Sequence, residues 1–111
     1  MTITPAALWG PTQVAGTATA LYTCPIAVTA VIKRVTFLNT DTVAVTLTVH
    51  LVRSGGSATA ANKLINALSL SANQTYQSPE LANLVLTAGD AIQALASTAS
   101  KINSTGSGFT L

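Results

Sequence analysis

The stretch VAVTLTVHLVR, residues 43–53, decides the fold class because its side chains alternate between apolar and polar. Successive side chains of a β-strand point to opposite faces, so this alternation predicts a half-buried strand. The inward row is aliphatic: Val43, Val45, Leu47, Val49 and Leu51. The outward row consists of Thr42, Ala44, Thr46, Thr48, His50 and Val52. His50, the only histidine of the chain, is therefore predicted to point away from the core.

Short runs of the same kind recur roughly every 10 residues, which is the spacing typical of a sandwich or barrel. Val, Ile and Thr dominate these runs, and β-branched residues favour strands over helices. The expected strands cover residues 14–23, 30–39, 43–53, 65–70, 75–79, 84–86, 91–97 and 101–111. Residues 58–64 fit either a helical turn or an extended segment. The turn residues 39–42 predict a hairpin between the second and third strands. We therefore predict an all-β fold, an antiparallel β-sandwich that is jelly-roll-like, with about eight strands.

The second of these segments departs from simple alternation. Val35 and Phe37 share one face, whereas Ile32 falls on the other face, with Lys33 and Arg34 between them. A β-bulge inserts one extra residue into a strand, so a bulge at Lys33–Arg34 would return Ile32 to the core side. The sequence therefore predicts a bulge at these two cations.

Residues 1–13 contain Pro5, Pro11 and the only tryptophan, Trp9. Because proline cannot donate to a sheet ladder, we expect an extended N-terminal arm here, followed by a single β-sandwich domain over residues 14–111. Trp9 can dock on its own sheet or on a neighbouring subunit. Tryptophan concentrates binding energy at interfaces, which favours the neighbouring subunit.

Charged residues make up only 7% of the chain, whereas a soluble domain has about 25%. A freely dissolved protein keeps many charges for solubility, so the deficit indicates a chain that packs against copies of itself or a large partner. We expect a homo-oligomer, with a trimer as the favoured order. The cations Lys33, Arg34, Arg53, Lys63 and Lys101 form no stripe with aromatic residues, so no nucleic-acid partner is expected. No apolar run approaches the roughly 20 residues of a membrane span, so no membrane association is expected either.

The chain contains few candidate residues for catalysis. Cys24 and His50 would need Asp41 or Asp90 as an orienting acid, but both aspartates lie in predicted turns, where their side chains cap backbone N–H groups. One histidine and three scattered acids lack the spacing of metal ligands. Glu80 and Asp90 are the candidates for a glycosidase carboxylate pair, and turn roles explain both. We expect no enzymatic activity, no cofactor and no metal.

Three stretches of the chain resemble small virion structural proteins of tailed bacteriophages: LYTCPIAVTAVIKRVTFLNT (21–40), VAVTLTVHLVRSGG (43–56) and LVLTAGDAIQALAS (84–97). In that group a similar opening leads into a Val/Thr-rich strand that ends in a Ser-Gly loop, and an AGD segment follows later. These stretches cover about half of the chain and leave the residues before 14 outside. The resemblance implies a non-enzymatic β-sandwich that decorates or cements the head, or a tail-associated module.

We therefore expect a capsid decoration or cement protein on the head surface, bound to the major capsid protein or other virion proteins. Residues 1–13 lack the basic and apolar regions of a secretory signal, which agrees with synthesis in the cytoplasm of a bacterial host. The alternative is a tail- or fibre-associated β-sandwich module that contacts the host surface; a small hydrolase and a host-derived binding domain are further rivals. The predicted interface residues are Trp9, Leu8, Pro11, Thr46, Thr48, His50 and Val52.

Overall fold

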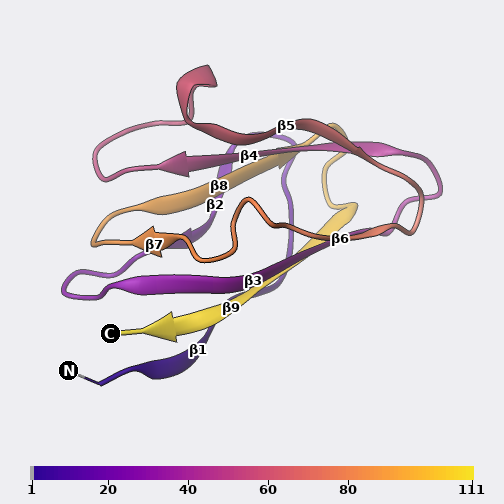
Figure 1. Cartoon of the computed structure of the whole chain (residues 1–111). Helices are drawn as coiled ribbons and strands as arrows, with labels where there is room; N and C mark the ends of the chain where they lie inside the picture. The colour runs from indigo at the N-terminus through magenta and orange to yellow at the C-terminus, as the bar shows by residue number, and fades with distance from the viewer. Residues whose placement is uncertain (1) are drawn as a thin grey trace.

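The computed structural model describes residues 2–111, whose strands form two antiparallel sheets packed face to face (Figure 1). The first sheet contains, in spatial order, β1 (Thr4–Gln13), β9 (Ile102–Thr110), β3 (Ala30–Asn39) and β6 (Thr75–Gln77), and β7 (Val85–Leu86) also pairs with β3. The second sheet contains β2 (Thr19–Thr23), β8 (Ala91–Ala96), β4 (Val45–Val52) and β5 (Lys63–Leu70).

The chain passes repeatedly from one sheet to the other, since β1 and β3 belong to the first sheet and β2 and β4 to the second. Both β6 and β7 pair with β3, so together they act as one interrupted strand. Two antiparallel sheets connected in this way form a double-sheet jelly roll. The predicted all-β, jelly-roll-like sandwich is therefore confirmed.

One helical element interrupts the strands in the described part of the chain. It is the 3-10 helix η1 (Ala60–Asn62), and β5 begins directly after it. Residues 58–64, which fitted either a helical turn or an extended segment, thus contain both. No helix within residues 2–111 is long and apolar enough to cross a membrane.

The inward side chains of the two sheets form one core. From β4 the core receives Val45, Leu47 and Val49, all fully buried, as the alternation predicts. Each such side chain contributes about 1.5–3 kcal/mol relative to an exposed position. Of the other two members of the predicted inward row, Leu51 is half-buried and packs against the core, whereas Val43 precedes the strand and is 60% exposed.

The predicted β-bulge in β3 is present. The register between β3 and β9 shifts between Ile32 and Arg34, so Lys33 is the extra residue. Ile32 and Val35 consequently both face the core, while Lys33 and Arg34 are both exposed. This bulge explains how two adjacent cations fit into a strand that covers the core.

The predicted hairpin between β3 and β4 is wrong, because the two strands lie in different sheets. The buried side chain of Asn39 accounts for the difference. Its amide nitrogen donates hydrogen bonds to the carbonyl oxygens of Val43 and Leu70, both at 3.0 Å, and of Ser71 at 3.2 Å. These bonds fix the turn after β3 to the end of β5, so the chain crosses to the second sheet instead of folding back on the first.

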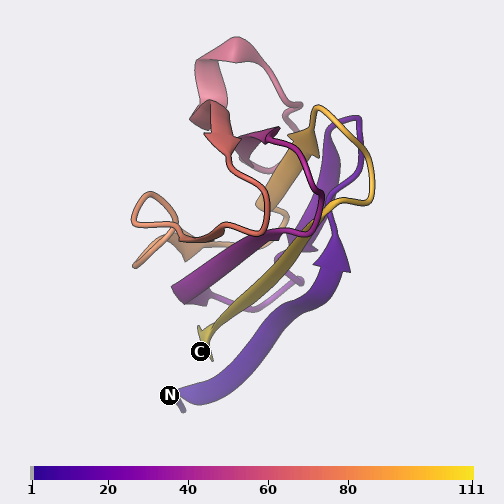
Figure 2. The ribbon, with the colours of Figure 1, turned by 90° about the vertical axis from the view of Figure 1, so that its right-hand side faces the viewer.

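The predicted N-terminal arm is instead an edge strand of the sandwich. β1 pairs antiparallel with β9 along most of its length, with register shifts on either side of Trp9. Proline is tolerated here because an edge strand uses only one of its sides for ladder hydrogen bonds. Figure 2 shows β1 running along the outer edge of the first sheet. The sandwich therefore starts at Thr4, and the strand expected over residues 14–23 is shortened to β2.

Candidate functional site

Most of the predicted interface residues lie inside the chain itself. The seven residues divide into buried Trp9, Thr48, His50 and Val52, half-buried Leu8 and Thr46, and exposed Pro11. A side chain that is buried within its own chain is not available to a neighbouring subunit. The outer face of β4 is covered instead by residues that follow it in the sequence.

The cover over β4 is held in place by His50. Its Nδ1 lies 2.8 Å from the side-chain carbonyl oxygen of Asn62 in η1, which also accepts the backbone N–H of Thr59 at 3.0 Å. An amide oxygen only accepts hydrogen bonds, so Nδ1 carries the proton in this contact. Nearby, the hydroxyl of Thr48 accepts the backbone N–H of Ala67 at 3.0 Å. His50 therefore has a structural role in this fold.

Trp9 docks on its own sandwich. Its indole Nε1 donates a hydrogen bond to the hydroxyl of Ser104 at 3.0 Å. Its ring lies 6.1 Å from the ring of Tyr22 in β2, with an interplanar angle of 31°. Since β1 and β2 belong to different sheets, this aromatic pair joins the two sheets, and Trp9 is not left over for a neighbouring subunit.

The residues weighed for catalysis make separate contacts. The buried thiol of Cys24 donates to the carbonyl oxygens of Val28 at 3.2 Å and Leu86 at 3.6 Å, and burial raises the pKa of this thiol. His50 bonds to Asn62 instead, so thiol and imidazole form no nucleophile–base pair. Within residues 2–111, no three His, Cys, Asp or Glu side chains gather closely enough to hold a metal ion.

Asp90 connects two loops at one end of the sandwich. Its carboxylate, in a residue that is 2% exposed, accepts the guanidinium of Arg53 at 2.7 Å and the backbone N–H of Ser54 at 3.0 Å. It also accepts the backbone N–H of Thr87 at 3.0 Å and the hydroxyl of Thr87 at 3.1 Å. Burial alone would raise the pKa of Asp90, but these donors outweigh burial and lower the pKa to about 2. The turn role predicted for Asp90 is confirmed, and the contact to Arg53 extends it.

Asp90→Asn is expected to lower the free energy of unfolding at pH 7 by about 2 kcal/mol, the value of a pKa lowered from 3.8 to about 2. A depressed carboxyl pKa stabilises the fold above the unfolded pKa, and this stability is lost as the pH falls toward 2. Urea denaturation between pH 2 and 6 measures the effect. Asp41→Asn, which removes a carboxylate from another turn, is the matched control and should lower the free energy of unfolding at pH 7 by less than Asp90→Asn does, because Asp41 is only partly buried. If the free energy of unfolding of Asp90→Asn falls with pH as steeply as that of the wild type, the stabilising role of the Asp90 carboxylate is contradicted.

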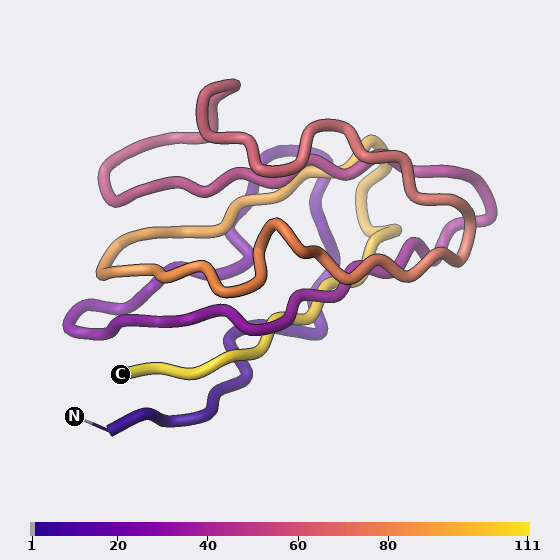
Figure 3. The backbone as a smooth tube through the Cα atoms, viewed as in Figure 1, coloured from indigo at the N-terminus to yellow at the C-terminus, as the bar shows by residue number. Residues whose placement is uncertain are grey.

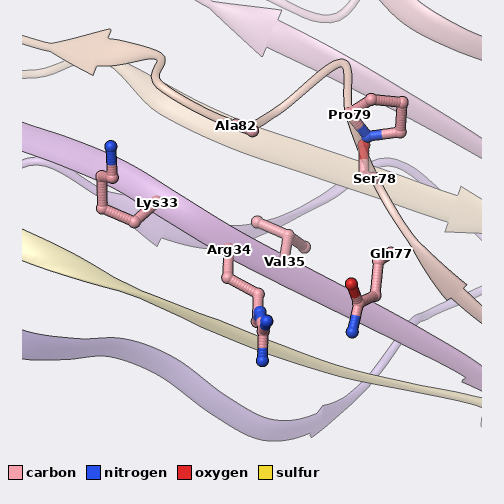
Figure 4. Close-up of a pocket in the computed structure, with 7 residues that line it drawn as sticks. All are labelled: Lys33, Arg34, Val35, Gln77, Ser78, Pro79 and Ala82. Atoms are coloured by element: carbon pink, nitrogen blue, oxygen red, sulfur yellow. The ribbon is translucent and has the colours of Figure 1, made fainter.

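An open groove of about 370 Å3 lies beside the bulge of β3. Its lining residues are Lys33, Arg34 and Val35 of β3, and Gln77, Ser78, Pro79 and Ala82 at the end of β6 and in the connection to β7. In Figure 4, Lys33 extends to one side of β3, whereas Arg34 and Gln77 extend to the other. The sequence predicted the bulge but not the groove, although two adjacent cations within a core strand were a signal for an exposed polar site.

A row of apolar residues crosses the outer face of the first sheet. In register order the row consists of Pro5 in β1, Phe109 in β9, Val31 in β3 and Val85 in β7. The row faces outward because Ala30 and Ile32, on either side of Val31, are fully buried. It lies at the end of the sandwich where the two termini meet, opposite the turn between β3 and β4 (Figure 3). Val85 is 48% exposed, and what is informative is that it lies in a row with three other apolar side chains.

Comparison with solved structures finds the same fold in a virus. A chain in the structure of infectious bursal disease virus, Gx strain, is similar with a TM-score of 0.56 and 13% sequence identity, over 99% of this chain and 32% of that chain. A chain in the structure of the Gt strain has a TM-score of 0.48 and 14% identity, over 98% of this chain and 30% of that one. This chain thus spans about a third of the length of the viral chain, and the likeness shows a common fold alone. The sequence matches no family model and no curated protein.

Proposed function

We propose that this chain is a non-enzymatic structural protein of a bacteriophage virion, most specifically a capsid decoration or cement protein that stabilises the head. The observation that carries the proposal is the jelly roll, which is similar over 99% of the chain to a chain in a virus structure. The assignment to bacteriophages rests on the resemblance of residues 21–40, 43–56 and 84–97 to small phage virion proteins.

The chemistry of the described residues supports a structural role. Cys24 and His50 form hydrogen bonds to different parts of the fold, and the carboxylate of Asp90 accepts four hydrogen bonds. A rigid sandwich with few charges is suited to burying surface against neighbours, at about 25 cal/mol per Å2 of apolar area, repeated over many symmetry copies. The mechanism of the proposed function is therefore mechanical.

Electron cryomicroscopy of particles assembled with and without this chain tests the proposal. We expect its density on the head surface, and we expect heads without the chain to break at a lower temperature. Density at the tail or on a fibre would support the tail-associated alternative instead. Particles whose density contains no jelly roll of this size would overturn the virion assignment.

We also propose that copies of the chain associate, with a trimer as the favoured order, through the apolar row of the first sheet. Exposed apolar patches mark interaction surfaces in soluble proteins. Arg53 and Asp90 at the same end neutralise each other, so this pair presents no net charge to a second copy.

Val85→Lys is expected to weaken self-association at least about tenfold, because it places a charge in the contact. Analytical ultracentrifugation over a concentration series measures the association constant. Val43→Lys is the matched control, since Val43 is 60% exposed at the opposite end of the sandwich. The control should associate like the wild type. A wild-type chain that stays monomeric at its highest soluble concentration would contradict the proposal.

A further inference from the structure

The bulge of β3 places two cations on the surface where a regular strand would place one. Adjacent side chains of a regular strand point to opposite faces, so either Lys33 or Arg34 would enter the core. With Lys33 as the extra residue, both side chains are exposed beside the groove. Within residues 2–111 the one ion pair joins Arg53 and Asp90. Neither Lys33 nor Arg34 therefore forms an ion pair within the described chain, and the carboxylate of Glu80, which follows the lining residue Pro79, accepts hydrogen bonds from Tyr76 and Ser78 instead.

The groove offers hydrogen-bond donors on two separate sides. On one side, the ammonium of Lys33 donates to the side-chain oxygen of Asn83 at 2.7 Å, which positions it and leaves two of its three donors for a ligand. On the other side, Arg34 and Gln77 extend together (Figure 4). A guanidinium has five donors in a planar arrangement that matches a carboxylate. The ligand that fits this lining is rich in negatively charged acceptors.

Apart from Ser78, whose hydroxyl donates to Glu80 at 3.0 Å, the remaining lining is apolar and indicates the size of the ligand. The exposed ring of Pro79 and the half-buried methyl group of Ala82 line the same groove. Apolar side chains form no hydrogen bonds with a small inorganic anion, but they can pack against the hydrocarbon part of a peptide. A small anion is also unable to meet both cations, since Lys33 and Arg34 extend to opposite sides of β3. Nucleic acid fits poorly, because the lining has two cations and no aromatic side chain on which a base could stack.

We propose that this groove binds an extended polypeptide segment that carries two acidic side chains. One carboxylate meets the ammonium of Lys33, the other meets the guanidinium of Arg34 and the amide of Gln77, and the backbone between them lies over the apolar lining. The inference rests on the proposed virion function, in which the segment belongs to a neighbouring subunit of the particle. It names the chemistry of that partner, which the fold alone does not.

A titration of the full chain with a capped tetraglutamate peptide, followed by NMR, tests the groove directly. We expect saturable shifts of the backbone amides of residues 33–35 and 77–82. Exposed ion pairs are worth up to about 1 kcal/mol each, so Lys33→Gln and Arg34→Gln should each weaken binding up to about fivefold. Raising the salt concentration should weaken binding further.

Lys63→Gln is the matched control for Lys33→Gln. Lys63 is also an exposed lysine on a strand, and its ammonium donates to an asparagine, Asn66, at 3.1 Å. This variant should bind the peptide like the wild type. The proposal is overturned if Lys63→Gln loses as much affinity for the peptide as Lys33→Gln. It is also overturned if the wild type binds a capped tetraglutamine peptide as tightly as tetraglutamate, or if inorganic phosphate shifts the same amides to the same extent. Because the titration uses no particle, its failure would leave the location of the chain in the virion untouched.

Discussion

Deletion of residues 2–13 is expected to produce a chain that no longer folds cooperatively. The deletion removes the whole of β1, which pairs with β9 in the first sheet, and it removes Trp9 from the junction with the second sheet. A small domain has a free energy of unfolding of about 5–15 kcal/mol, and the loss of one large buried aromatic side chain alone removes a large part of it. Circular dichroism during heating measures the result. A deleted chain that melts cooperatively near the wild-type temperature would show that the segment is a dispensable arm, as the sequence suggested.

Trp9→Ala gives a graded version of the same prediction. Trp9 is 7% exposed and lies against Gly106, where an added Cβ would approach the indole to 2.6 Å. Removal of this ring is expected to lower the free energy of unfolding by about 3–5 kcal/mol. Trp9→Phe keeps an aromatic ring but loses the hydrogen bond to Ser104, so it should cost distinctly less than Trp9→Ala. Urea denaturation of both variants measures the difference, and equal losses would contradict the packing role of the ring.

The sequence predicted the strands whose pattern is local. The alternation over residues 45–51 and the parity break in β3 follow from side chains that face one core, and both were predicted correctly, including the bulge at Lys33. β1 was missed because Pro5 and Pro11 are signals against a ladder, and they carry that meaning only for a strand with partners on both sides. Which strands pair was predicted less well, since the crossing after β3 depends on the bonds of Asn39 to Leu70 and Ser71, far along the chain.

The candidate site was predicted less well than the fold for a similar reason. The outward row of β4 looked free in the sequence, because the residues that cover it have no periodic pattern. His50 is buried, and its imidazole is bonded to Asn62, twelve residues away, a contact that no spacing rule predicts. The groove at Lys33 and Arg34 arises where β6 leaves β3 and before β7 joins it, so it depends on strand pairing and not on local sequence.

Gly108→Ala is expected to lower the free energy of unfolding by at least about 3 kcal/mol, at or beyond the upper end of ordinary overpacking. A Cβ at this position would fall on the carbonyl oxygen of Val31 and would come within 3.1 Å of the backbone nitrogen of Lys33. Both obstacles are backbone atoms of the bulged part of β3, and backbone atoms cannot rotate away as the end of a side chain can. The substitution must therefore push β3 and β9 apart at the place where the bulge exposes both cations.

Gly16→Ala is the matched control, since it adds the same methyl group where the nearest atom is the Cβ of Ala99 at 3.5 Å. Neither glycine has a left-handed φ, so the two substitutions differ in the space available and not in backbone strain. The control should change the free energy of unfolding by less than about 1 kcal/mol. Urea denaturation of both variants measures the contrast. If Gly108→Ala is as stable as Gly16→Ala, β3 and β9 do not approach each other this closely, and the bulge does not set the position of Lys33 and Arg34.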